Sequence, residues 1–312
     1  MALSRGGLRF WLFAASALVA CAVWSSDITL RADAGHDLRA TLPPAGGQSR
    51  QPSLVTSRGV QRKRILYMEG APRPEMKFLR RAMDDVADTQ LVTLQRTRDN
   101  KYLRFDVEGP DELRNGFPRT TEELFAYRGL ILGPIEASAF TAEQHQMIAD
   151  FVGVRGGGLL VLGGGQSLGE GGWAGTPLAH VLPIIIESTG RRQAPEIVDH
   201  LIVTPTAAGV NHPAIRIADT AAAAARLWLE MPQVSTVNAV SEKPGGTILL
   251  NAVDESGRER IVLAVQSQGR GKSAVFTIQD SWRWQMAPKA PPLAHERFWR
   301  SLLAWLVDGV PE

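Results

Sequence analysis

Residues 159–177 read LLVLGGGQSLGEGGWAGTP, and this stretch decides how the rest of the chain is interpreted. Four apolar residues in a row, bounded by glycines, are typical of a strand that is buried on both faces of a sheet. The glycine-rich turn after that strand is therefore expected at the carboxyl edge of the sheet. In open α/β sheets, this edge is where ligands bind.

The segments that precede this strand alternate between strand and helix patterns. Short apolar runs predict further strands, and apolar stripes at helical spacing predict helices. The predicted strands cover 65–68, 91–94 and 129–132, and the predicted helices cover 74–86, 120–127 and 141–152. Residues 97–117 are polar and aromatic, and we expect a long loop there. The alternation predicts an α/β fold with a doubly wound, mostly parallel sheet.

The second half of the chain is richer in strand patterns. Strand candidates lie at 184–186, 201–203, 247–253, 261–266 and 274–278, and helices are expected over 221–228 and 292–307. Ahead of the first strand, residues 27–62 lack sustained periodicity and hold several Pro and Gly, so a linker is predicted there. The folded domain is accordingly expected to span residues 63–312.

Composition excludes several classes of protein. Among 312 residues, Lys and Arg number 34 and Asp and Glu number 32, which gives a net charge of +2. Nucleic-acid-binding proteins usually carry a clear basic excess, so no nucleic-acid partner is expected. One Cys cannot form an internal disulfide or a Cys-rich zinc site. The six His are scattered without the spacing of metal ligands, so neither a metal nor a cofactor is expected.

The first 26 residues have the pattern of a signal peptide or membrane anchor. Arg5 and Arg9 precede residues 10–24, which are apolar apart from Ser16. A basic start followed by about 15 apolar residues fits a secretory signal, whereas a spanning helix needs about 20. Both alternatives predict export of the remaining chain.

The single cysteine lies inside this apolar run. Residues 18–21 read Leu-Val-Ala-Cys, which resembles the lipobox of bacterial lipoproteins, so Cys21 is a candidate for lipidation. Cleavage after Ala22 and retention as an uncleaved anchor remain open as alternatives. We expect a lipoprotein or an inner-membrane-anchored protein, with the domain on the periplasmic side.

Three interpretations compete for the glycine-rich turn. A phosphate cradle would need a Lys-Ser/Thr pair or dinucleotide-binding spacing, and both are missing. A nucleophile elbow is suggested by residues 165–169, Gly-Gln-Ser-Leu-Gly, which match G-x-S-x-G around Ser167. In such an elbow, however, the Ser follows the strand directly, whereas three glycines intervene here. The third interpretation is structural, because glycine permits close backbone approach and positive φ.

Carboxylates are predicted at the same edge as the turn. Glu69 follows the first strand, and Asp280 follows the last strand pattern. Together with Ser167 and Glu170 they are candidates for hydrolytic chemistry, since paired carboxylates near a Ser can act as acid and base. The alternative is that they accept hydrogen bonds from loop amides and fix the edge.

Glycines and tryptophans define a possible binding edge. The half-apolar, half-polar indole ring suits contacts with sugars or with a partner protein, although packing is the commoner role. The residues assigned to this ligand or partner edge are Gly163, Gly164, Gly165, Trp173, Trp282 and Trp284.

Five stretches carry a family resemblance. They are RILYMEGAPRPEMKFLRRAM (64–83), GFPRTTEELFAYRGLILG (116–133), RGGGLLVLGGGQSLGEGGWAGTPLAHVLP (155–183), DSWRWQM (280–286) and HERFWRSLLAWL (295–306). In this order they resemble the glutamine amidotransferase-like domain of bacterial membrane proteins, over about residues 63–307. The resemblance implies a flavodoxin-like fold of the class I glutamine amidotransferase type. It also implies a partner, since relatives often carry a von Willebrand factor A domain in a membrane-tethered chain.

The sequence departs from active amidotransferases at the residues that carry their chemistry. Those enzymes use a Cys thiolate at the strand-to-helix elbow and a His partner. Here residues 163–165 are glycines, and the late strand is followed by Asp280-Ser281-Trp282 rather than by a His. We therefore expect a non-enzymatic binding or assembly module of the bacterial envelope. A hydrolase of changed chemistry, using Ser167 or the edge carboxylates, is the alternative.

Overall fold

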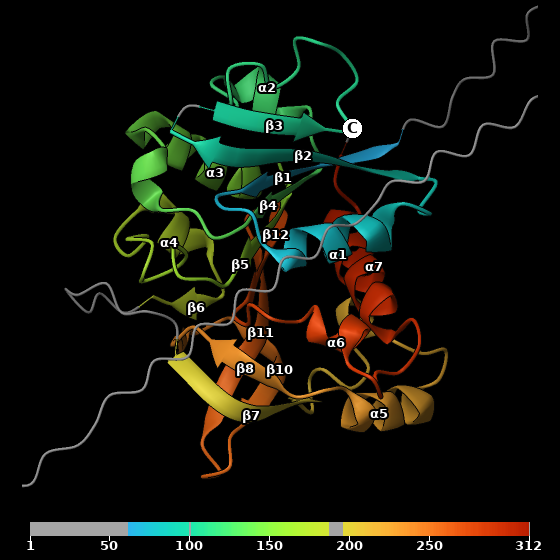
Figure 1. Ribbon diagram of the computed structural model, residues 1–312. Coiled ribbons are helices and arrows are strands. Elements are labelled where there is room, and N and C mark those ends of the chain that lie inside the picture. The colour runs from blue at the N-terminus through green and yellow to red at the C-terminus, as the bar shows by residue number, and fades with distance from the viewer. Residues whose placement is uncertain (1–61, 100, 187–195, 312) are drawn as a thin grey trace, which may run out of the picture. The chain divides into compact units, whose positions relative to one another are not determined.

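The computed structural model describes residues 62–99, 101–186 and 196–311 (Figure 1). The predicted signal or anchor at 1–26, with Cys21, lies outside this part, as does the linker 27–62 except for its last residue. In the part described, no helix combines the length and apolar character needed to cross a bilayer.

Ten of the described strands form one sheet, in the order β3-β2-β1-β4-β5-β12-β11-β10-β7-β8. Its strands are β1 (Lys63–Glu69), β2 (Thr89–Arg98), β3 (Lys101–Phe105), β4 (Gly129–Leu132), β5 (Gly158–Leu162), β7 (Glu196–Pro205), β8 (Val234–Val237), β10 (Thr247–Val253), β11 (Glu259–Gln268) and β12 (Gly271–Phe276). The five central neighbours, from β2 to β12, pair in parallel, and the flanking strands pair antiparallel. A separate two-stranded sheet joins β6 (Ile184–Ile185) to β9 (Ser241–Glu242).

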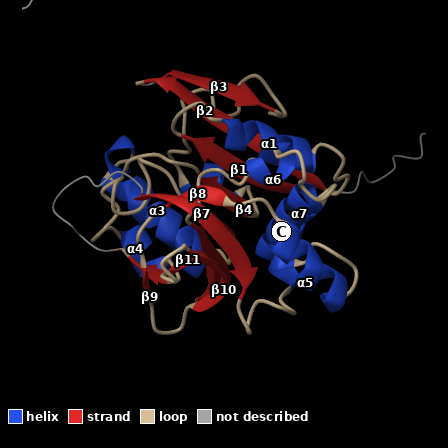
Figure 2. Cartoon of the chain, turned by 60° about the horizontal axis from the view of Figure 1, so that its bottom comes forward, coloured by secondary structure: helices blue, strands red, loops and turns tan. Residues whose placement is uncertain are grey.

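Helices cover both faces of this sheet, as Figure 2 shows. On β1, Ile65 and Tyr67 belong to one buried cluster and Leu66 and Met68 to another, because successive strand residues point to opposite faces. The first cluster receives α1 (Pro74–Met83), α5 (Ala221–Glu230), α6 (Arg283–Met286) and α7 (Ala294–Val307). The second receives α2 (Thr121–Phe125), α3 (Ala142–Gly153) and α4 (Pro177–Val181). Short 3₁₀ helices lie at Ala137–Ala139 and Pro213–Ile215.

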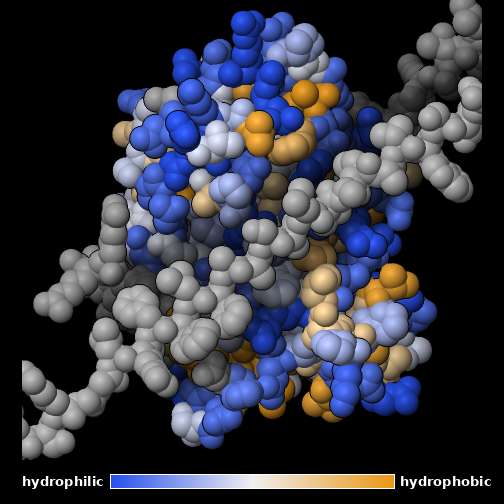
Figure 3. All heavy atoms as spheres, in the orientation of Figure 1, coloured by the Kyte–Doolittle hydropathy of each residue, from blue (hydrophilic) through white to orange (hydrophobic). Residues whose placement is uncertain are grey.

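The longest helices bury their predicted apolar stripes. In α7, Phe298, Trp299 and Leu302 are completely buried, as the spacing of apolar residues requires for a helix that docks on a core. In α3, Thr141 and Gln144 form the expected capping box. On the face shown in Figure 3, hydrophobic residues occur as small patches among hydrophilic ones.

The antiparallel part of the sheet curls back toward its parallel centre. Strand β8 pairs with β7, and Val237 at its end forms a bridge with Ile278, two residues after β12. The closure places the chain that follows β8 beside the carboxyl end of β12. Residues 235–238 thereby reach the predicted ligand-binding edge.

The structure confirms the α/β class, the parallel centre of the sheet and the β-rich second half. It corrects the expected loop at 97–117, because Lys101–Phe105 forms strand β3 antiparallel to β2. This strand has side chains that are at least partly exposed throughout, so it has no apolar run to reveal it. Strand β8 was also not predicted, since its sequence Val-Ser-Thr-Val contains only two apolar residues.

Candidate functional site

The carboxyl ends of four parallel strands meet at one edge. The strand register aligns Met68 of β1 with Leu132 of β4, and Leu162 of β5 with Phe276 of β12. The residues that follow these positions are Glu69, Gly133, Gly163 and Thr277, so they share this edge. Sequence analysis therefore located the edge correctly.

The glycine turn after β5 has no space for side chains at its first two positions. A Cβ atom on Gly163 would lie 2.1 Å from the Thr277 carbonyl oxygen, and one on Gly164 would lie 2.1 Å from Pro134 Cγ. Both glycines are buried, whereas Gly165 is exposed. The first two positions are thus closed to any nucleophilic side chain by overlap with fixed neighbouring atoms.

Asn238 fixes the backbone of this turn. Its Oδ1 accepts a hydrogen bond from the Gly164 amide at 2.8 Å, and its Nδ2 donates to the Gly164 carbonyl at 3.1 Å. Asn238 is 1% exposed and directly follows β8. The curled antiparallel strands thereby brace the turn of the parallel sheet through these two hydrogen bonds.

Ser167 is bonded to the backbone. Its buried Oγ donates to the Leu162 carbonyl at 2.6 Å. No helix starts at this Ser, because α4 begins only at Pro177. A nucleophile elbow needs a strand-to-helix turn that exposes the hydroxyl. The environment of Ser167 therefore matches a loop-stabilising hydroxyl better than a nucleophile.

Glu69 forms a buried ion pair with Arg73. The Glu69 carboxylate is completely buried, and Arg73 Nε lies 3.0 Å from its Oε2 and 3.2 Å from its Oε1. The Tyr67 hydroxyl donates to the same carboxylate. Arg73 Nη1 extends toward the Gly163 carbonyl at 3.4 Å. Glu69 is thus saturated by protein groups and supports the glycine turn through Arg73.

Burial also acts on the protonation of this group of residues. It raises the pKa of Tyr67 well above its usual value, and the neighbouring Glu69 carboxylate adds to that effect. A tyrosine in this state remains a neutral hydrogen-bond donor. Tyr67 therefore keeps the proton that it donates to the Glu69 carboxylate.

Asp280 holds β8 against the end of β12. Its Oδ2 accepts hydrogen bonds from the Ser235 amide and the Ser235 hydroxyl, both at 2.9 Å, and its Oδ1 accepts from Thr236 Oγ1 at 2.9 Å. Arg283 lies 3.6 Å from the same carboxylate. Asp280 thus makes the kind of contacts expected if the edge carboxylates accept hydrogen bonds and fix the edge.

Glu75 links the first turn of α1 to the segment after β12. It is 1% exposed and accepts hydrogen bonds from the Ser281 hydroxyl and from the Trp282 amide, the latter at 3.2 Å. Burial raises the pKa of Glu75 to about 7, partly offset by Arg73. Because both carboxylate oxygens of Glu75 accept hydrogen bonds from the loop after β12, Glu75 connects α1 to the edge near Asp280.

The four predicted hydrolytic residues do not form a connected cluster. Glu170 is half-buried, and burial raises its pKa although a hydrogen bond from Asn238 opposes that rise. Among the described residues, no hydrogen bond or ion pair joins Ser167 to Glu69, Glu170 or Asp280. The described part of the chain also contains no group of three or more His, Cys, Asp or Glu side chains that is suited to a metal ion.

Two of the predicted edge tryptophans belong to the core, which corrects their assignment to a binding surface. Trp173 is 1% exposed and donates to the Ile135 carbonyl at 2.8 Å. Trp284 is fully buried, donates to the Pro232 carbonyl at 3.0 Å and packs edge-on against Trp228. Burying such a large side chain against other aromatic rings stabilises the fold more than leaving it in solvent does. Trp282 alone is half-buried at the edge.

Sequence reasoning missed the residues that organise the edge. Asn238 follows an unpredicted strand, and its approach to Gly164 depends on the closure of the sheet. Arg73 and Glu75 precede or open α1, where the sequence gives no sign that their partners lie in the core. The spacing of Glu69 and Arg73, four residues apart, was the only local signal.

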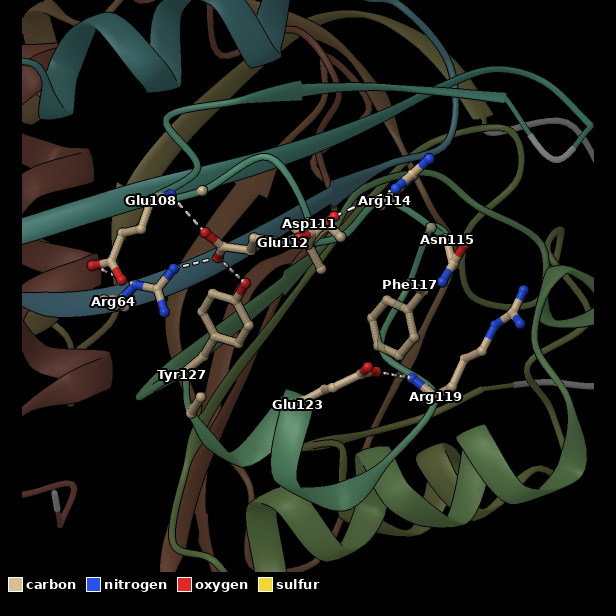
Figure 4. A pocket seen from close by; sticks show the side chains of 14 residues that line it. Arg64, Glu108, Asp111, Glu112, Arg114, Asn115, Phe117, Arg119, Glu123 and Tyr127 are labelled. Carbon is tan, nitrogen blue, oxygen red and sulfur yellow. Dashed lines mark hydrogen bonds and ion pairs between the residues drawn. The ribbon is translucent and has the colours of Figure 1, made fainter.

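A pocket of about 370 Å³ lies at the opposite, amino end of the parallel strands (Figure 4). Arg64 and Tyr127 both bond to the Glu112 carboxylate, and the Arg64 guanidinium lies 4.9 Å above the Tyr127 ring. Phe117 lines another side. The charges of Arg64 and Glu112 in this pocket are therefore paired with each other. The sequence analysis did not predict this pocket.

Comparison with known proteins gives one family and a shared fold. The family model described as "Putative glutamine amidotransferase" matches residues 100–308. The cytoplasmic protein STM3548 from Salmonella typhimurium is similar in structure, with a TM-score of 0.56 and 16% identity over 78% of this chain and 98% of that one. The cytoplasmic protein STM1381 from Salmonella typhimurium LT2 gives a TM-score of 0.50 and 20% identity over 78% and 99%. No curated protein matches significantly.

Proposed function

Because the chain belongs to the glutamine amidotransferase-like family, we propose that it is a non-hydrolytic member, a binding or assembly module of the bacterial envelope. The observation that carries the proposal is the closed glycine turn. Class I amidotransferases need a thiolate where the turn follows the strand. Here a Cβ on Gly163 or Gly164 would lie 2.1 Å from a neighbouring atom. The lack of space for a side chain at these two positions supports a non-hydrolytic role.

The positions at which the other catalytic groups are expected also support the proposal. The only Cys of the chain is Cys21, far from this edge in sequence. Asp280 occupies the region after β12 in which a His partner is expected, and it binds β8. These replacements favour a rigid edge of a doubly wound, flavodoxin-like sheet that presents a fixed surface to a partner.

The surface available for binding is the tip of the turn. Gly165 and Gln166 are exposed, and Trp282 is half-buried beside the same edge. A rigid, preorganised loop loses little conformational entropy on association. We propose an envelope protein as the partner, such as a protein that carries a von Willebrand factor A domain.

A hydrolase remains the alternative function, with Ser167 or the edge carboxylates as its chemistry. It requires a base that accepts the Ser167 proton, and in the described residues that proton is directed at the Leu162 carbonyl. The contacts of Glu69 and Asp280 are likewise made with structural groups. The binding module therefore accounts for more of the geometry.

The purified full chain is expected to release no ammonia from glutamine. The reason is the absence of a thiol from this turn, where Gly163 and Gly164 leave no space for a side chain. Ammonia production by the native protein is compared with that of a heat-denatured sample over the same period. Steady release above this control would refute the non-hydrolytic proposal.

We further propose that the N-terminal segment exports the chain and holds it at the membrane. The support is the apolar run 10–24 behind Arg5 and Arg9, with Cys21 as the lipidation site. Cell fractionation is expected to place the full chain with the membrane, and a mainly cytosolic chain would contradict this. Cys21→Ala is expected to lose the lipid mass, with Ser16→Ala as the matched control. A Cys21→Ala chain that stays in the membrane with unchanged mass would favour the uncleaved anchor.

A further inference from the structure

A second pocket, of about 310 Å³, lies where the end of α1, the start of β2 and the end of β3 meet. This is the amino end of the parallel strands, so the pocket is separate from the edge that carries the proposed function. Its volume is at the lower end of the range of about 300–1,000 Å³ that is typical of small-molecule sites. It is lined by Arg62, Arg80, Met83, Asp84, Thr89, Gln90, Leu91, Asp106 and Val107.

Two buried polar atoms of this lining have no hydrogen-bond partner. One is a donor, Arg80 Nε, and the other is an acceptor, Gln90 Oε1. Gln90 as a whole is only 8% exposed. Buried polar groups in folded proteins are nearly always bonded, so each exception requires an explanation. A bound group that both donates and accepts would satisfy the two atoms together.

Both side chains are held in place by Asp106. Arg80 Nη2 donates to Asp106 Oδ2 at 2.9 Å, and Gln90 Nε2 donates to the Asp106 carbonyl at 2.7 Å. The Arg80 guanidinium also lies 4.4 Å above the Phe105 ring. Rotating the Gln90 amide by a half-turn would leave Nε2 without a partner and would place Oε1 against the Asp106 carbonyl oxygen, which cannot donate a hydrogen bond. The free donor and the free acceptor are therefore preorganised.

The charges of the lining indicate a neutral ligand. Two cations, Arg62 and Arg80, are balanced by two anions, Asp84 and Asp106. An anionic ligand would meet the two carboxylates, and a cationic ligand would meet the two guanidinium groups. Hydroxyl groups both donate and accept, and neighbouring hydroxyls can satisfy Gln90 Oε1 and Arg80 Nε together. We propose that this pocket binds a neutral polyhydroxylated molecule, a sugar or polyol of about monosaccharide size.

Calorimetric titration of the full chain tests this proposal. The probes are D-glucose, N-acetyl-D-glucosamine and myo-inositol, with acetamide and sodium sulfate as amide and anion comparators. At least one hydroxylated probe is expected to bind saturably. Gln90→Met and Arg80→Lys are each expected to weaken that binding by about tenfold or more, because each removes the protein group that would bond a ligand hydroxyl.

Matched variants separate this effect from loss of folding. Gln95→Met changes the same residue type on the same strand, at 6% exposure but outside the pocket. Arg81→Lys repeats the charge-preserving change on the exposed neighbour of Arg80. Both controls are expected to bind the probe as the wild type does, and thermal unfolding checks that all four variants are folded. Absence of saturable sugar or polyol binding, binding of acetamide or sulfate alone, or equal binding by all folded variants would overturn the proposal. None of these results bears on the non-hydrolytic edge.

Discussion

Gly164→Val is expected to lower the free energy of unfolding by about 3 kcal/mol or more, with a fall in melting temperature of about 10 °C. The physical cause is overlap, because even the first added carbon would lie 2.1 Å from Pro134 Cγ and 2.5 Å from Pro134 Cβ. Proline is rigid and cannot move its ring away from the intruding group. Relief would require the turn to shift, which would also break the two hydrogen bonds between Gly164 and Asn238.

Two variants of the same loop serve as controls for Gly164→Val. Ser167→Ala removes only the hydroxyl bond to Leu162, which is expected to cost about 1 kcal/mol. Gly172→Ala adds a Cβ where no heavy atom lies within 4 Å but φ is +73°, so it measures backbone strain without overlap, again about 1 kcal/mol. Equal small losses for all three variants would show that the turn is not packed against the sheet edge.

Glu69→Gln and Arg73→Met are each expected to cost about 3–5 kcal/mol of stability, the usual result of breaking a buried ion pair. Glu69 is fully buried, and the Arg73 side chain is 14% exposed. Either single change leaves one charge without its partner in a region from which water is largely excluded. The double variant removes both charges and is expected to recover part of the loss. Chemical denaturation of the four proteins measures the coupling between the two residues.

A surface pair provides the matched control for this cycle. Asp111 and Arg114 are also an acid and an arginine, 3.4 Å apart, but their side chains are 86% and 71% exposed. Asp111→Asn is expected to cost less than about 1 kcal/mol, because water screens and replaces the interaction. If the Glu69 and Arg73 variants were as mild as Asp111→Asn, the pair would not support the glycine turn as described.

Strong local patterns allowed most of the parallel core to be predicted. The strand at 159–162 is an unbroken apolar run, and the structure gives β5 over Gly158–Leu162. Helix α3 was predicted from its capping box, which is a signal contained within four residues. In both cases the information needed for the local structure lies within the element itself.

Elements that depend on distant partners could not be predicted in this way. Strand β8 has two buried and two partly exposed residues, and it becomes a strand because β7 lies beside it. The contact between Asn238 and Gly164 joins residues 74 positions apart. The position of the carboxyl edge in the fold was predicted, but the residues that bond to Glu69 and Asp280 were not. Their roles follow from the closure of the antiparallel strands onto the end of β12.

The central claim, that the family scaffold here lacks a working nucleophile at its carboxyl edge, is tested most directly by covalent labelling of the folded full chain. The chain is incubated with an electrophilic glutamine analogue and, separately, with a fluorophosphonate that reacts with activated serines, and its intact mass is measured. The closed turn at Gly163 and Gly164 and the bond from Ser167 to Leu162 predict an unchanged mass with both reagents. A one-to-one adduct that maps to Ser167 and is lost in Ser167→Ala would contradict the claim.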